Sequence, residues 1–161
     1  YLYDSGVVHG ISATQFAPQG NITRGDFAVM LYNAFNVDST SSGGSQAFTD
    51  VPAGTYYTEA VNTLHRMGIV NGVGGGKYAP TGNVSRQDAI CMVHRAMRSM
   101  GWSTGSGGGS LLSSYSDGGS VADYARNDMA NAVLKGYLPI TNGRLDSNAL
   151  LTLILHRVLT Y

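Results

Sequence analysis

Hydrophobic residues recur at helical spacing in five stretches of the chain. Apolar side chains three or four positions apart share one face of an α-helix, so each stretch predicts an amphipathic helix. Three stretches form one class, with stripes at Phe27, Leu31, Ala34 and Phe35, at Ala89, Ile90, Val93, Ala96 and Met97, and at Leu151, Leu155, Val158 and Leu159. Two stretches form a second class, with stripes at Ala60, Val61, Leu64 and Met67, and at Met129, Ala132 and Val133. Gly68 and Gly136 follow the second class and predict left-handed helix ends.

The helices belong to a sequence repeat. Three groups of landmarks recur at an offset of 62 positions, namely Gly6–Gly10 with Gly68–Gly72, Phe16–Pro18 with Tyr78–Pro80, and Ile22–Asp26 with Val84–Asp88. A constant offset across such gaps indicates tandem repeats. A third copy is visible at residues 115–117 and, at the same offset, at residues 155–158, but its loop after Gly136 is about six residues shorter and Asn148 replaces the arginine.

The repeats predict one mostly α-helical domain over residues 1–161. We assign a partial first repeat to residues 1–36, an intact second repeat to residues 47–100 and a degenerate third repeat to residues 115–161. Ser/Gly-rich segments at 38–46 and 103–113 are expected to be flexible linkers. A single helix pair cannot bury its own stripe, so we expect three pairs to pack together. Because the first repeat lacks its opening motif, we expect the chain as given to start inside a repeat, as a trimmed or processed piece would.

Composition narrows the classes of function. The chain has 43% hydrophobic and only 12% charged residues, with a formal net charge of zero, and no basic cluster favours nucleic acid. No apolar run reaches the ~18 residues of a membrane span. The single cysteine, Cys91, is expected to be buried and inert. The four histidines have no metal-ligand spacing, and His94 is expected at the surface. No nucleophile motif or repeated carboxylate pair indicates catalysis or a cofactor.

The start of the helices of the first class carries the main chemical signal. Residues 23–26 and 85–88 both fit a capping box, in which a hydroxyl caps the helix and an acid three residues later returns to the cap. Arg24 and Arg86 then occupy the first helical position, which is unfavourable for a cation. A helix N-terminus beside a guanidinium can receive a carboxylate or phosphate. Alternatively, each arginine pairs with Asp50 or Asp117, or with carbonyl groups of the neighbouring repeat.

Two tyrosines stand at the start of the other helix class. Tyr56 and Tyr124 occupy matching positions, and an aromatic face near an anion site can stack on a sugar ring. The alternative is that each ring is half-buried and covers the start of its helix. The third repeat loses the arginine and the acid together but keeps its apolar helix. This loss favours a ligand-binding role over a purely structural one.

These residues resemble the S-layer homology (SLH) domain. The resemblance rests on Phe48–Val51, Gly68–Gly72, Tyr78-x-Pro80 and Val84–Asp88, and it covers nearly the whole chain. It implies a pseudo-threefold helical bundle, located at the bacterial cell surface, whose grooves bind a secondary cell wall polysaccharide bearing pyruvylated N-acetylmannosamine. The implied ligand-binding residues are Arg24, Arg86, Asp50, Tyr56, Tyr124, Gly10 and Gly72.

The resemblance leads to a specific hypothesis. We expect a non-catalytic wall anchor with at most two usable grooves, because Asn148 replaces the basic residue of the third repeat. Replacing Arg24 and Arg86 by alanine should then abolish wall binding without unfolding the chain. The competing interpretation is an assembly or adhesion module that contacts protein, including neighbouring surface-layer subunits. Removing the wall polymer should distinguish the two.

Overall fold

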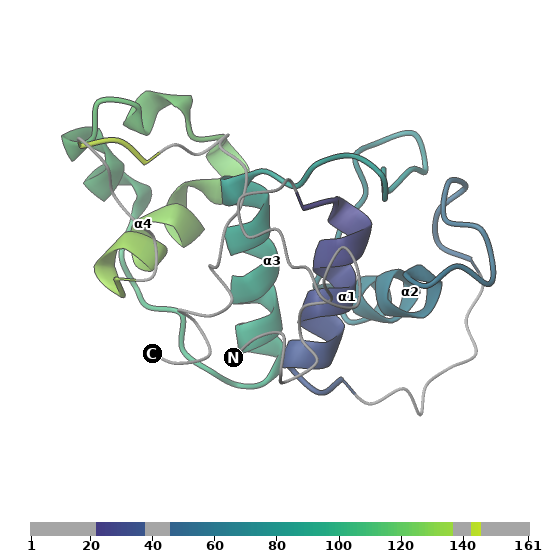
Figure 1. The fold of residues 1–161 in the computed structure, drawn as a ribbon. Coiled ribbons are helices and arrows are strands. Elements are labelled where there is room, and N and C mark those ends of the chain that lie inside the picture. Colours follow the sequence, from purple (N-terminus) through teal and green to yellow (C-terminus); the bar gives the residue numbers. More distant parts are fainter. Residues whose placement is uncertain (1–21, 38–45, 137–142, 146–161) are drawn as a thin grey trace, which may run out of the picture. The chain divides into compact units, whose positions relative to one another are not determined.

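The structure, a computed structural model, describes residues 22–37, 46–136 and 143–145 (Figure 1). Regular structure within these residues is helical, with isolated β-bridges and no strand, which confirms the mostly α fold class. The chain divides into two compact units, Tyr1–Val84 and Ser85–Tyr161. The boundary falls inside the expected second repeat, so each unit joins a helix of one repeat to the following repeat. The threefold bundle stays a prediction.

The first unit contains α1 (Arg24–Ala34) and α2 (Thr58–Arg66), which contact each other. Helix α1 begins where expected, because Thr23 Oγ1 accepts the Asp26 N–H at 3.1 Å. The largest fully buried side chains of this unit come from both helices and from the loop that follows α2: Phe27, Leu31, Leu64, Ile69 and Tyr78. Met67 does not extend the apolar stripe of α2 as expected, since the helix ends at Arg66 and Met67 is 41% exposed.

A tightly folded loop connects α2 to the end of the first unit. Gly68 adopts a φ of 75° directly after the helix, which confirms the expected left-handed end. Residues 73–77 then form a closed turn, in which the Val73 N–H donates to the Lys77 carbonyl at 2.8 Å and the Lys77 N–H donates to the Gly74 carbonyl at 3.1 Å. A bridge between Thr23 and Asn83 ties the end of the loop to the start of α1. The loop therefore lies against the N-terminus of α1.

The second unit contains α3 (Arg86–Ser99) and α4 (Arg126–Leu134), which also contact each other. Three short 3₁₀ segments precede α4: Gly109–Ser114, Gly118–Ser120 and Asp123–Ala125. Gly136 follows α4 with a φ of 78° and repeats the helix end seen at Gly68. Cys91 is buried as expected, and burial raises the pKa of its thiol to about 12, which keeps the thiol protonated and unreactive.

The expectation that His94 lies at the surface is wrong. Its side chain is fully buried on α3, and its Nδ1 lies 3.0 Å from Asp128 Oδ1 on α4. Arg98 donates to the same oxygen at 2.9 Å. Burial opposes ionisation of Asp128, but the hydrogen bonds from His94 and Arg98 outweigh it and lower the pKa of Asp128 to about 2. A polar histidine can be buried here because its partner arrives from a distant helix.

The second Ser/Gly-rich segment is not the loose connector that the sequence predicts. The side chain of Asn131 accepts from the Gly107 N–H at 2.8 Å and donates to the Gly107 carbonyl at 3.2 Å. The Gly109 N–H donates to the Asn127 side chain at 2.9 Å. A Cβ on Gly109 would lie 2.8 Å from the Cβ of Arg126, an atom fixed to the backbone of α4, so this close approach requires glycine. Small residues in this segment therefore allow the chain to pack on α4.

Among the described residues, no helix has both the length and the apolar character needed to cross a membrane.

Candidate ligand-binding site

The backbone amides at the start of α1 are already hydrogen bonded. The Arg24 N–H donates to the Gly82 carbonyl at 2.8 Å, and the Gly25 N–H donates to the Pro80 carbonyl at 2.9 Å. The next amide, of Asp26, is capped by Thr23. These are the groups that a helix N-terminus would otherwise offer to an anion. The sequence analysis placed a bound anion at these amides. In the structure, carbonyl groups of the loop of the first unit accept these hydrogen bonds instead.

The Arg24 side chain binds the same loop. It is only 8% exposed, its Nε donates to the Tyr78 carbonyl at 2.8 Å, and its Nη2 donates to the Asn71 carbonyl at 2.9 Å. Its guanidinium carbon lies 4.6 Å from the centre of the Tyr78 ring, and the Tyr78 hydroxyl donates to the Arg24 carbonyl at 3.0 Å. The sequence left two structural alternatives for Arg24, pairing with an aspartate or with carbonyl groups of the neighbouring repeat, and these contacts match the second. Because carbonyls are uncharged, these bonds orient the guanidinium without cancelling its charge.

Asp50 supports the loop from the opposite side. Its two carboxylate oxygens accept the Tyr78 and Ala79 N–H groups, each at 2.8 Å. Burial opposes ionisation of Asp50, but these backbone hydrogen bonds outweigh it and lower its pKa. Ala79 has a φ of 57°, and successive amides in such a turn form a concave anion site. Here the anion is Asp50 itself, so this carboxylate has a structural role.

The second unit repeats this arrangement, which we call the Arg–Asp frame: an arginine and an aspartate that bind the two sides of one loop residue. Arg86 Nη1 donates to the Leu145 carbonyl at 3.2 Å, and the Leu145 N–H donates to Asp117 Oδ1 at 2.8 Å. Leu145 thus matches Tyr78, and each lies 28 positions after its aspartate. Because Leu145 matches Tyr78, the shortening that the sequence shows after Gly136 falls in the part of the chain that follows Leu145.

The two expected tyrosines share a second arrangement, which we call the Tyr–Asp pair. The Tyr56 hydroxyl donates to Asp26 Oδ1 and the Tyr124 hydroxyl donates to Asp88 Oδ1, both at 2.5 Å. Tyr56 is 70% exposed and Tyr124 is 60% exposed, so these rings are not half-buried covers. Partial burial and the bond to Asp26 raise the pKa of Tyr56 to about 12, so its hydroxyl stays protonated.

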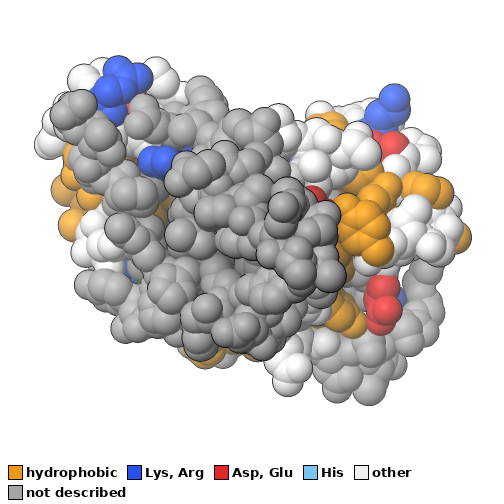
Figure 2. Space-filling view, in the orientation of Figure 1, with side chains coloured by type: hydrophobic (Ala, Val, Ile, Leu, Met, Phe, Trp, Pro, Cys, Tyr) orange, Lys and Arg blue, Asp and Glu red, His pale blue; other side chains and the backbone are white. Residues whose placement is uncertain are grey.

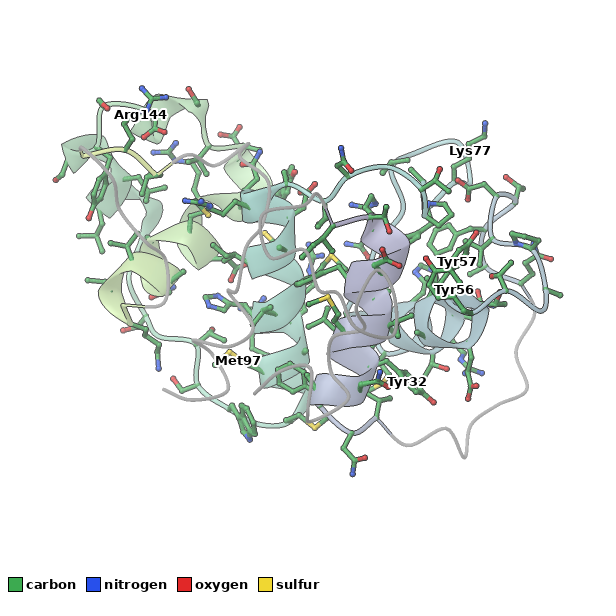
Figure 3. All side chains as sticks on the ribbon, viewed as in Figure 1. Tyr32, Tyr56, Tyr57, Lys77, Met97 and Arg144 are labelled. Carbon is green, nitrogen blue, oxygen red and sulfur yellow. The ribbon has the colours of Figure 1, made fainter. Side chains whose placement is uncertain are left out.

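Tyr56 is an exposed aromatic side chain that packs on a buried one. Tyr57 packs edge-on against Tyr56, with ring centres 5.0 Å apart, and is itself buried. Figure 3 shows both tyrosines beside the start of α2, and the matching region of Figure 2 carries a group of hydrophobic side chains with an acidic side chain below it. An exposed ring whose hydroxyl is fixed by a carboxylate can stack on a sugar, while the carboxylate accepts a sugar hydroxyl.

Two partners in this site were missed from the sequence. Asp26 and Asp88 were interpreted as the acids of capping boxes, and the half of each box in which the hydroxyl accepts the acid's amide is confirmed. Their carboxylates also bind the tyrosine hydroxyls, across 30 and 36 positions of sequence. The signal that could have identified them is that the tyrosine and the acid recur together in two copies.

The remaining expected site residues have simpler roles. A Cβ on Gly72 would lie 2.6 Å from the Lys77 carbonyl and 2.7 Å from the Phe48 ring, so glycine is required there by backbone packing. Gly10 lies outside the described residues, as does Asn148. The structure therefore brings Arg24, Asp50 and Tyr56 to one unit, and Arg86 and Tyr124 to the other. A direct role of these residues in ligand binding stays a prediction.

In comparison with known proteins, part of these repeats matches one family. Residues 1–28 and 47–90 match the S-layer homology domain. A surface-layer 125 kDa protein of Lysinibacillus sphaericus is 28% identical over 155 residues, which cover 94% of this chain and 12% of that protein. An S-layer protein of Bacillus licheniformis is 38% identical over 89 residues, covering 55% of this chain and 10% of that protein.

An enzyme also matches the chain. An amylopullulanase of Thermoanaerobacterium thermosulfurigenes is 32% identical over 139 residues, which cover 85% of this chain but only 7% of the enzyme. The chain thus spans a small part of each of these relatives, and the shared part is the S-layer homology segment. The family and its surface-layer relatives indicate a location at the bacterial cell surface or cell wall.

Proposed function

Because the chain carries S-layer homology repeats over residues 1–28 and 47–90, we propose that it is a non-catalytic module that anchors a larger protein to the cell wall by binding a wall polysaccharide. The observation that carries this proposal is the Tyr–Asp pair, present in both units with the same 2.5 Å hydrogen bond. Two copies suit a repetitive polymer, because once one is bound the second contact is intramolecular and raises the avidity.

The exposed rings supply the sugar-binding surface. Aromatic side chains bury a large area at low conformational cost, and the bond to Asp26 or Asp88 fixes the ring further. The carboxylates retain lone pairs that can accept sugar hydroxyl groups. A neutral, hydroxyl-rich glycan therefore fits this surface better than a nucleic acid does.

We assign the finer specificity to a pyruvylated sugar. The positive charges of Arg24 and Arg86 lie at the first position of α1 and α3, two residues before Asp26 and Asp88. A carboxylate on the sugar would be attracted by that charge. Since Arg24 is only 8% exposed, we expect its guanidinium to act on the ligand mainly through its electric field.

A binding assay with purified cell walls tests the proposal. The double variant Tyr56→Ala and Tyr124→Ala should lose most wall binding while its circular dichroism spectrum stays unchanged, because both rings are mostly exposed. Trp102→Ala is a matched control, because Trp102 is 50% exposed but lies after the C-terminal end of α3. Tyr124, in contrast, binds Asp88 in the first turn of α3. A folded double variant that binds walls as well as the wild type would contradict the proposal.

The polymer itself is tested by removing it. Wild-type binding should fall sharply on walls stripped of their secondary polymer, and should fall in part on walls from which only the pyruvyl group is removed. Unchanged binding to stripped walls would favour the protein-binding alternative, in which the same surfaces contact neighbouring surface-layer subunits.

A further inference from the structure

The two units place a large buried side chain differently beside their Tyr–Asp pairs. In the first unit, Tyr56 is followed by Tyr57, and the residue after the arginine of the Arg–Asp frame is Gly25. In the second unit, the matching residues are Ala125 and Gln87. All four of these matching residues are buried. The larger residue therefore comes from the N-cap of α2 in the first unit and from α3 in the second.

Gly25 leaves the room that the ring of Tyr57 occupies. A Cβ on Gly25 would lie 3.1 Å from Cδ1 and 3.3 Å from Cγ of Tyr57, and 3.0 Å from the Pro80 carbonyl oxygen. Both neighbours are fixed, because the Pro80 carbonyl accepts the Gly25 N–H at 2.9 Å and Tyr57 is only 9% exposed. Glycine is unfavourable in a helix. Its presence in the first turn of α1 is explained by the ring that packs against it.

The second unit fills the matching position in another way. Gln87 is 6% exposed, and its Oε1 accepts the Ala122 N–H at 2.9 Å. Ala125 is fully buried but carries no ring that could pack against Tyr124. Exchanging a large and a small side chain between neighbouring elements keeps the interior filled. Core packing alone therefore does not require a tyrosine at position 57.

Tyr57 also holds the exposed ring of Tyr56. The two rings meet edge-on, with their centres 5.0 Å apart and their planes at 78°, and both are labelled in Figure 3. The Tyr56 hydroxyl is held separately by Asp26. The ring is thus supported at its hydroxyl and by a neighbouring ring, while 70% of the residue remains exposed. A ring supported in this way loses less conformational freedom when a sugar stacks on it.

We propose that Tyr57 is a positioning residue for the sugar-binding ring of Tyr56, and that Gly25 is the residue that leaves room for it. This inference rests on the proposed wall-binding function. The affinity of the first unit for a sugar then depends on two buried residues that the ligand does not touch. Because the second unit carries Gln87 and Ala125 at these positions, the affinity of each unit can be changed separately.

Binding of short secondary-polymer fragments, released from purified walls, to a Tyr124→Ala parent tests the inference, because sugar binding then depends on the first unit. Isothermal titration calorimetry measures the affinity, and urea unfolding gives the folded fraction by which each affinity is corrected. Tyr57→Ala should lower the affinity about 2- to 10-fold, since the ring of Tyr56 must then be ordered by the ligand. Tyr57→Phe keeps the ring and should bind like the parent.

A double variant separates positioning from core packing. Gly25→Gln with Tyr57→Ala gives the first unit the residues of the second, so it should recover part of the stability that Tyr57→Ala loses, while its affinity stays low. Phe35→Ala is a matched control, because Phe35 is 8% exposed and lies at the C-terminal end of α1, away from Asp26. At equal folded fraction, this control should be less stable but bind like the parent.

The outcomes separate this inference from the function on which it rests. Parental affinity in Tyr57→Ala, an equal loss in Tyr57→Phe or Phe35→Ala, or an affinity that returns with stability in the double variant would overturn the inference. A Tyr124→Ala parent that binds no fragment, although the wild type does, would overturn it as well. A wild-type chain that binds no polymer would instead refute the proposed function itself.

Discussion

Replacing Arg24 by alanine should destabilise the first unit, although the sequence alone suggested a folded variant that only loses binding. The change removes two hydrogen bonds from a charged donor, to Tyr78 at 2.8 Å and to Asn71 at 2.9 Å. Bonds involving a charged group contribute about 1.5–3 kcal/mol each. The position of the guanidinium over the Tyr78 ring adds about 0.5–2 kcal/mol.

Water will enter beside the truncated side chain and hydrogen bond to some of the loop carbonyl groups. We therefore expect the free energy of unfolding to fall by about 3–5 kcal/mol. This is a large fraction of the 5–15 kcal/mol typical of a domain. Urea unfolding followed by far-ultraviolet circular dichroism measures it directly. Arg24→Lys keeps the charge but not the planar pair of donors, so it should fall between the wild type and Arg24→Ala.

Arg66→Ala is the control for this experiment, because Arg66 is exposed and donates a hydrogen bond to the hydroxyl of Thr63, one turn earlier in the same helix. We expect a change within about 0.5 kcal/mol. An Arg24→Ala variant that also stays within about 1 kcal/mol of the wild type would refute the structural role of Arg24. If Arg24→Ala is destabilised as expected, its wall binding must be compared at equal folded fraction, because an unfolded variant also fails to bind.

Two further predictions concern the acids that organise the units. Asp50→Asn keeps one acceptor oxygen for the two loop amides, so it should cost about 1–3 kcal/mol in urea unfolding, and an unchanged midpoint would contradict the role of the carboxylate. Asp128 has its pKa lowered from 3.8 to about 2 in the folded chain, so its stabilising effect should be complete above pH 3.8 and lost as the pH falls toward 2. Asp128→Asn should be less stable than the wild type at pH 6, and the difference should shrink by pH 2; a constant difference across this range would refute the assignment.

Local features of the fold were predictable from the sequence. The starts of α1 and α3 follow from Thr23 and Ser85, whose hydroxyls cap the helices as expected. The ends of α2 and α4 follow from Gly68 and Gly136, because only glycine readily takes a positive φ there. These signals are local, since the residues that decide them lie within one helical turn.

The parts that were not predicted depend on partners far away in sequence. Arg24 meets the loop residue Tyr78 across 54 positions, so its role as a support for the loop could not be distinguished from an anion site. His94 is buried because Asp128 lies across from it on another helix. The segment before α4 is ordered by the side chains of that helix, which a low-complexity composition does not reveal. In each case a specific tertiary contact overrides a preference based on residue type.

The Arg–Asp frame also limits how such chains can be recombined. Its arginine comes from one sequence repeat, and its aspartate and loop come from the next, so the repeat seen in the sequence is not the unit that folds. An exchange between homologous chains within residues 38–46 would pair a native arginine with a foreign loop. An exchange at the Val84–Ser85 boundary would transfer each frame whole. We expect hybrids joined at that boundary to fold more readily, because every arginine keeps the carbonyl groups with which it was selected.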